Sequence, residues 1–91
     1  MAVVHLVITG RVQGVGFRWY IREHARQSGL AGWVRNRADG AVEVAAAGTV
    51  ELLDALTRAA RHGPPGAHVA EVRSLATESL AELPHPFTVL R

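Results

Sequence analysis

Apolar and polar residues follow two different patterns along the first third of the chain. Residues Val3–Thr9 are mostly β-branched and apolar, which predicts a buried strand. From Phe17 onward the apolar positions follow helical spacing, so a helix is expected there. The face of this helix that turns inward would carry Phe17, Ile21, His24, Ala25 and Ser28. Gly29 suits the position just after the helix, and Leu30 is placed for the hydrophobic contact that accompanies such an ending.

The middle of the chain has the pattern of a hairpin followed by a second helix. Strands are predicted over residues 32–36 and 41–45, and Asp39-Gly40 between them favours a tight turn, which makes a hairpin. Thr49 is a good N-cap for the helix that follows. The inner face of that helix would carry Val50, Leu53, Leu56 and Ala60. The segment Gly63-Pro64-Pro65-Gly66 ends it, because proline cannot continue a helix.

Two further strands are predicted, over residues 68–75 and 87–90. The element order is therefore β-α-β-β-α-β with a short terminal strand. That order predicts an α+β fold, the ferredoxin-like split βαβ sandwich, in which two helices cover one face of a mostly antiparallel sheet. A chain of 91 residues has the length of one domain, so residues 1–91 are expected to form one. This fold serves many functions and decides none of them.

Composition removes several classes of chemistry. The chain has no cysteine, which excludes disulfides, thiolate nucleophiles, iron–sulfur clusters and cysteine-bound zinc. Its apolar N-terminal run is short and interrupted by His5, unlike a signal peptide or a membrane span. No membrane association is expected. We expect a cytoplasmic location.

The charges are unevenly distributed. Residues 10–37 carry six arginines and one acidic residue, whereas the rest carries four arginines and seven acidic residues. Arg18 and Arg22 fall in the first turn of the first predicted helix, where the helix dipole already disfavours cations. Arg22 and Arg26 are interpreted as a solvated face. Arg18 follows a glycine-rich loop at a helix start, which favours an anion site for a phosphate or sulfate ion.

That loop, residues 10–16, fits neither common nucleotide-binding pattern. Gly14-x-Gly16 is followed by Trp19 where a dinucleotide fingerprint needs glycine, and no Walker Gly-Lys-Ser/Thr sequence is present. The five histidines are scattered, with none at ligand spacing. His24 is expected to pack on its helix and the others to be ordinary surface or strand residues. No metal and no cofactor are expected.

RNA binding is a second function to weigh, because small basic domains of this architecture include RNA-recognition modules. Such modules stack bases on aromatic side chains of their central strands. The candidate strands at residues 3–9 and 41–45 contain none. The prolines of Gly63-Pro64-Pro65-Gly66 also lack the N–H groups that a nucleotide-clamping loop would need. No nucleic-acid partner is expected.

The chain resembles the acylphosphatase family over about residues 4–90. The first block of resemblance is Gly10-Arg11-Val12-Gln13-Gly14-Val15-Gly16-Phe17-Arg18, and the second is Gly29-Leu30-x-Gly32-Trp33-Val34-Arg35-Asn36. Shorter matches follow at Asp39-Gly40-x-Val42-Glu43 and at Gly63-Pro64-Pro65 with Ala67 and Val69. Both long blocks are specific, and they occur in the family's order.

The resemblance implies hydrolysis of a small-molecule acyl phosphate to a carboxylate and inorganic phosphate. It assigns phosphate binding to Arg18 and orientation of the attacking water to Asn36. It also implies that the backbone N–H groups of the loop cradle the phosphate, namely those of Gln13, Gly14, Val15, Gly16, Phe17 and Arg18. The family uses no metal and forms no phosphoenzyme, and a monomer is expected here.

Alternatives remain at this point. By itself, Asn36 is also typical of a turn, since Asn-Arg-Ala-Asp-Gly resembles a hairpin loop. Similar domains occur inside larger proteins that handle carbamoyl phosphate, so a non-catalytic anion-binding module is a competing hypothesis. Arg37 receives no family role, and nothing in the sequence specifies the acyl group.

Overall fold

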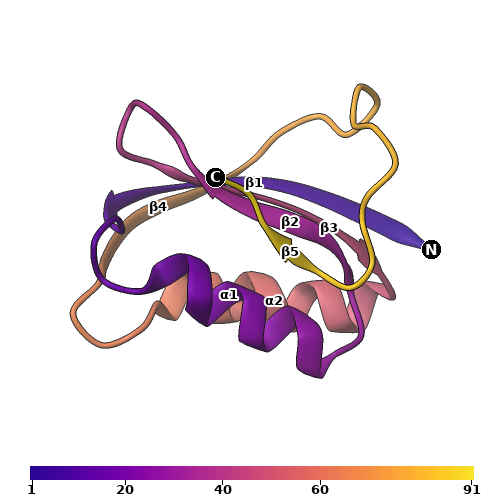
Figure 1. The fold of residues 1–91 in the computed structure, drawn as a ribbon, viewed down its shortest axis with the longest axis horizontal. Helices are drawn as coiled ribbons and strands as arrows, with labels where there is room; N and C mark the ends of the chain where they lie inside the picture. The colour runs from indigo at the N-terminus through magenta and orange to yellow at the C-terminus, as the bar shows by residue number, and fades with distance from the viewer.

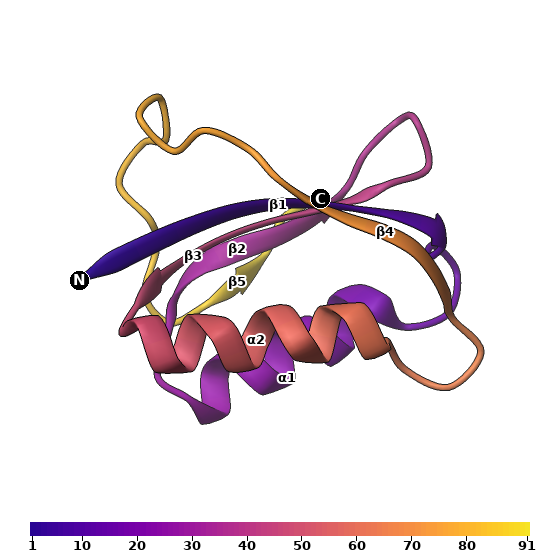
Figure 2. The same cartoon turned by 180° about the vertical axis from the view of Figure 1, so that it is seen from behind.

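A five-stranded sheet lies over two helices in the computed structural model, which describes all of residues 1–91 (Figure 1). The elements are β1 (Ala2–Arg11), α1 (Phe17–Gln27), β2 (Ala31–Asn36), β3 (Val42–Gly48), α2 (Val50–His62), β4 (His68–Ser74) and β5 (Thr88–Val89). The strands lie in the order β4-β1-β3-β2-β5, and only the β2–β5 pair is parallel. Both helices cover the same face of the sheet (Figures 1 and 2). The predicted α+β ferredoxin-like fold is confirmed.

The first strand is longer than predicted, and the glycine-rich loop is correspondingly shorter. Gly10 and Arg11 continue β1 by pairing with Val69 and His68 of β4, after a bulge between Thr9 and Gly10. Gly10 allows this pairing because its φ is +121° and a Cβ there would lie 2.2 Å from the carbonyl oxygen of His68. The prediction that the loop begins at Gly10 is therefore wrong, and the loop spans residues 12–16.

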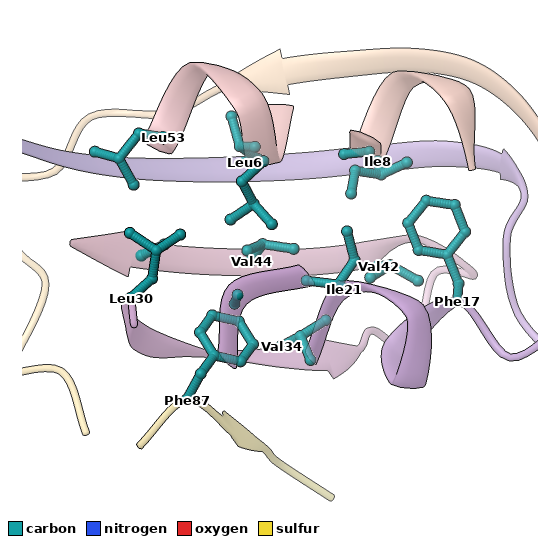
Figure 3. Close-up of a cluster of buried hydrophobic side chains, with 14 of the residues drawn as sticks. Leu6, Ile8, Phe17, Ile21, Leu30, Val34, Val42, Val44, Leu53 and Phe87 are labelled. Carbon is teal, nitrogen blue, oxygen red and sulfur yellow. The ribbon is translucent and has the colours of Figure 1, made fainter. Parts of the chain in front are cut away.

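The core lies between the sheet and the helices. Alternate residues of the two central strands face the helices: Leu6 and Ile8 from β1, and Val42 and Val44 from β3. The helices contribute Phe17, Ile21 and Ala25 from α1 and Leu53, Leu56 and Ala60 from α2. Phe87, just before β5, is fully buried and closes the β2 side of this core (Figure 3).

Two predicted inward-facing residues are on the surface. Val50, the first residue of α2, is 57% exposed, and the buried residues of this helix begin only at Leu53. His24 is also exposed, and its ring meets the edge of Tyr20 at a centroid distance of 4.7 Å. Helical spacing places a residue on a face, but the width of the covered stripe depends on what packs against it.

The helix ends follow the predicted capping. The N–H of Leu30 donates to the carbonyl of Ala25 at 2.9 Å and that of Gly29 to Arg26 at 3.1 Å, with Gly29 at a φ of +69°. This is the expected glycine ending of α1. The hydroxyl of Thr49 accepts the N–H of Leu52 at 3.2 Å and so caps α2. Neither helix is long and apolar enough to cross a membrane.

The sheet face away from the helices contains a buried acid that sequence reasoning missed. The segment between β4 and β5 passes over the N-terminal part of this face (Figures 1 and 2). On this face Glu43 of β3 is only 5% exposed. His5 donates to it at 2.6 Å, and Nε of Arg35 donates at 2.9 Å. Burial by itself raises the pKa of Glu43, but these two hydrogen bonds outweigh burial and hold the pKa below its ordinary value of 4.5.

Glu43 should therefore make the free energy of unfolding sensitive to acid. A carboxyl whose pKa is lower in the folded state contributes stability that is present above pH 4.5 and is lost as the pH falls through the folded pKa. Glu43→Gln removes that contribution, so we expect lower stability at pH 7 and a flatter dependence between pH 5 and pH 3. Urea unfolding at several pH values measures both. Glu71→Gln, on the exposed strand β4, is the control, and equal acid dependence in Glu43→Gln and wild type would contradict this account.

Candidate active site

A pocket of about 360 Å³ opens where the start of α1 meets the ends of β2 and of the chain beyond β5. Its lining comes from these three places and from the loop between β1 and α1. The lining residues are Val12, Gly14, Gly16, Phe17, Arg18, Trp19, Arg22, Asn36, Val89 and Arg91. Arg18 and Asn36, the two residues to which the sequence pointed most strongly, thus lie in one pocket.

The loop over residues 12–16 depends on two glycines with left-handed backbone. Gly14 has a φ of +77° and Gly16, the N-cap of α1, a φ of +78°. A Cβ at either position would meet no other atom within 4 Å. The backbone angle therefore requires glycine there, and free space is not the constraint.

The loop and the first turn of α1 leave a run of backbone N–H groups without partners. From Gln13 to Trp19, no N–H donates to a carbonyl or side chain of the protein. The helix has no side-chain cap at its N-terminus and no acidic residue in its first turn. Unpaired N–H groups and the positive end of the helix dipole make this a site suited to an anion.

Three arginines of α1 differ in what they contact. Arg18 is half-buried, lines the pocket and takes part in none of the ion pairs of the structure. Arg22 pairs with Glu23 at 2.7 Å, and its guanidinium lies 4.5 Å from the ring centre of Trp19. Arg26 donates to the carbonyl of Phe87 at 2.7 Å. The interpretation of Arg22 as a solvated face residue is wrong, since it also lines the pocket, and exposed Arg26 holds the segment that leads into β5.

Asn36 is the last residue of β2, and its backbone pairs with Val42. Its half-buried side chain makes no hydrogen bond within the protein, so both its donor and its acceptor are available to a ligand or a water molecule. Sequence alone left a turn role open for this residue. The turn comes directly afterwards, at residues 37–41, and Asn36 itself ends the strand.

The predicted loop residues do not all contribute to the pocket wall. Gly14, Gly16 and Phe17 line it, whereas Gln13 and Val15 do not. Val15 packs against the core. Gln13 turns its side chain to the hairpin, where Nε2 donates to the carbonyls of Arg37 at 2.8 Å and Ala41 at 3.0 Å.

Val89 and Arg91 also line the pocket, although no sequence pattern selected them. The parallel pairing of Val34 with Val89 brings the end of the chain beside β2. If that register is followed for two residues, Arg91 comes level with Asn36. No local sequence signal could have found them, because only the β2–β5 pairing brings them here. Arg22 could have been found from its i,i+4 spacing to Arg18, and Trp19 from its i,i+3 spacing to Arg22.

A second, polar groove of about 580 Å³ adjoins the pocket and shares Asn36 and Arg91 with it. Two of its arginines are already paired: Arg35 with Glu43 at 2.8 Å and Arg37 with Asp39 at 2.9 Å. The pKa of Asp39 is lowered, first by the backbone N–H of Ala41 and then by Arg37. Arg37 is therefore a hairpin residue with its own counter-ion.

No three histidine, aspartate or glutamate side chains are grouped so that they could hold a metal ion. The chemistry available in the pocket is therefore that of arginine, amide and backbone N–H groups. These groups can bind an oxyanion and hold a water molecule beside it.

Comparison with known proteins identifies the family. The acylphosphatase family model matches residues 4–89. An acylphosphatase of Acidiphilium cryptum is 49% identical over 82 residues, which cover 90% of each chain. The crystal structure of the acylphosphatase from Bacillus subtilis superimposes with a TM-score of 0.91 at 36% identity and covers 100% of both chains. Full-length HypF, in a phosphate- and nucleotide-bound form, shares the fold over 12% of its own length at 23% identity and a TM-score of 0.72. The chain therefore belongs to the acylphosphatase family.

Proposed function

We propose that this protein hydrolyses acyl phosphates to a carboxylate and inorganic phosphate, with no metal ion. The observation that carries the proposal is the pocket in which Arg18, without an acidic partner, and Asn36, with a free amide, lie beside unpaired backbone N–H groups. Membership of the acylphosphatase family supports the same reaction.

Arg18 and the loop bind the phosphoryl group in this proposal. The planar guanidinium grips two phosphate oxygens, and the N–H groups from Gln13 to Arg18 surround the others. Phosphoryl transfer gains most of its rate from positioning and from stabilising charge on these oxygens. A phosphate or sulfate ion should occupy the same place when no substrate is bound.

Asn36 holds the attacking water in line with the departing carboxylate. The water oxygen forms a bond to phosphorus while the bond from phosphorus to the acyl oxygen breaks, and the carboxylate leaves with that electron pair. A carboxylate is stable as an anion, so the step needs no general acid. The titratable side chains of the pocket are arginines, which keep their protons, so the proton of the water passes to a phosphate oxygen or to solvent.

We further propose that the protein acts as a monomer on a small molecule and not on nucleic acid. The central strands β1 and β3 carry no phenylalanine, tyrosine or tryptophan on which bases could stack.

The proposed function makes three predictions, and the first of them concerns activity itself. The purified protein should hydrolyse benzoyl phosphate at the same rate with and without excess chelator, because no step depends on a metal. The rate per molecule should not change on dilution if the active species is a monomer. The loss of benzoyl phosphate absorbance measures both. If the protein is folded but hydrolyses no benzoyl phosphate, the proposed function is wrong.

The second prediction concerns Arg18. Arg18→Ala should reduce kcat/KM by about 10³-fold or more, as expected for loss of an arginine that stabilises phosphoryl charge. Arg18→Lys should fail as well, because lysine lacks the two-pronged geometry. Steady-state kinetics measure the change in kcat/KM. Arg58→Ala, at an exposed position of α2, is the matched control. Full activity in Arg18→Lys would contradict the bidentate contact.

The third prediction separates water positioning from phosphate binding. Asn36→Ala should lower kcat by about 10²-fold, the order of loss that follows from a misplaced reactant. The inhibition constant of inorganic phosphate should change little, because the loop and Arg18 remain. A parallel loss of phosphate affinity would place Asn36 in phosphate binding and not in water positioning.

A further inference from the structure

The side chain of Gln13 joins the two parts of the pocket. Its carboxamide nitrogen donates to two backbone carbonyls, those of Arg37 at 2.8 Å and Ala41 at 3.0 Å. No other hydrogen bond connects residues 12–16 with residues 37–41. The contact therefore ties the glycine-rich loop to the β2–β3 hairpin.

The two carbonyls that accept these bonds lie at the base of the hairpin turn. The N–H of Arg37 donates to the carbonyl of Ala41 at 2.8 Å, and the N–H of Gly40 donates to the carbonyl of Arg37 at 3.2 Å. Each carbonyl thus accepts one bond from the turn and one from Gln13. A side chain with two N–H donors on one head suits this pair of acceptors, and glutamine supplies it.

This base is one residue away from Asn36 on the β2 side and one residue away from its pairing partner Val42 on the β3 side. The side chain of Asn36 has no hydrogen bond of its own within the protein. Its position relative to the loop therefore depends on the backbone at the end of β2. Gln13 fixes that backbone against the loop.

We propose that the side chain of Gln13 is a positioning residue for the hydrolysis, acting through the hairpin to hold Asn36 in line with a phosphate bound by the loop. This inference rests on the proposed function. An in-line reaction is sensitive to displacement of the water, since about 1 Å of misplacement can cost about 10²-fold in rate. In the proposed function phosphate binding comes from N–H groups and Arg18, to which the side chain of Gln13 makes no hydrogen bond.

The test is Gln13→Met, which keeps the length of the side chain and removes both N–H donors. We expect kcat with benzoyl phosphate to fall about 10-fold or more, while the inhibition constant of inorganic phosphate stays within about twofold. Gln27→Met, at the exposed end of α1, is the matched control and should leave both unchanged. An unchanged kcat, or a phosphate affinity that falls in step with kcat, would overturn the inference.

Gln13→Glu provides a second variant of nearly the same shape. As a carboxylate it faces two carbonyl oxygens and repels them, whereas its protonated form has one O–H donor. Relative to wild type at each pH, its kcat should therefore recover partly as the pH falls, and that of Gln13→Met should not. If the ratio of the Gln13→Glu kcat to the wild-type kcat stays constant with pH, the result would count against a role for the Gln13 hydrogen bonds.

Hydrogen exchange separates failure of this inference from failure of the proposed function. If the wild-type protein hydrolyses no acyl phosphate, the proposed function fails first, and no positioning role for a reaction remains. The N–H of Gly40 donates to the carbonyl of Arg37, which also accepts a bond from Gln13. Its hydrogen-exchange rate therefore still reports on the Gln13 hydrogen bonds and should rise in Gln13→Met. If the wild type is active and the exchange rate of the Gly40 N–H is unchanged in Gln13→Met, the hydrogen bonds of Gln13 are not what holds the hairpin.

Discussion

The antiparallel pairing of β1 with β3 is the interaction on which the rest of the structure depends. It places Leu6 opposite Val44 and Ile8 opposite Val42, all facing the helices. A slip of one residue would turn the buried acid Glu43 toward the apolar core, so burial specifies the register strongly. Val42 also pairs with Asn36 of β2. The register that builds the core therefore also brings Asn36 to the end of the sheet where β1 runs into the glycine-rich loop.

The two helices differ in how their N-terminal N–H groups are satisfied, which supports the proposed anion site at the start of α1. α2 begins with a threonine cap and has Glu51 in its first turn, so its positive end is satisfied by the protein itself. α1 begins at a glycine without a cap and has no acid there. The N–H groups and the positive dipole end of α1 are left for a ligand, and Arg18 adds a charge of the same sign. An arrangement that costs stability without a ligand becomes favourable when an anion binds.

The arginines of residues 10–37 make different contacts. Arg35 and Arg37 are paired with Glu43 and Asp39, and Arg26 holds the chain before β5. Arg22 is shared between Glu23, the ring of Trp19 and the pocket wall. Arg18 keeps no partner of its own. Arg18 and Arg22 line the pocket, and of these two only Arg18 has no acidic partner.

The sequence by itself determined the element order, the fold and the glycine and threonine caps of the helices, and it pointed to Arg18 and Asn36, which the structure places in one pocket. These features follow from local periodicity, from glycine and threonine at capping positions, and from two long motifs. Only the tertiary structure decided that Val89 and Arg91 join the pocket, that His5 and Arg35 share the buried Glu43, and that Gln13 bonds the hairpin. Arg35 and Glu43 lie opposite each other across the β2–β3 hairpin, and the other contacts join residues far apart in the chain. Such contacts are set by strand order and register, which short-range patterns do not encode.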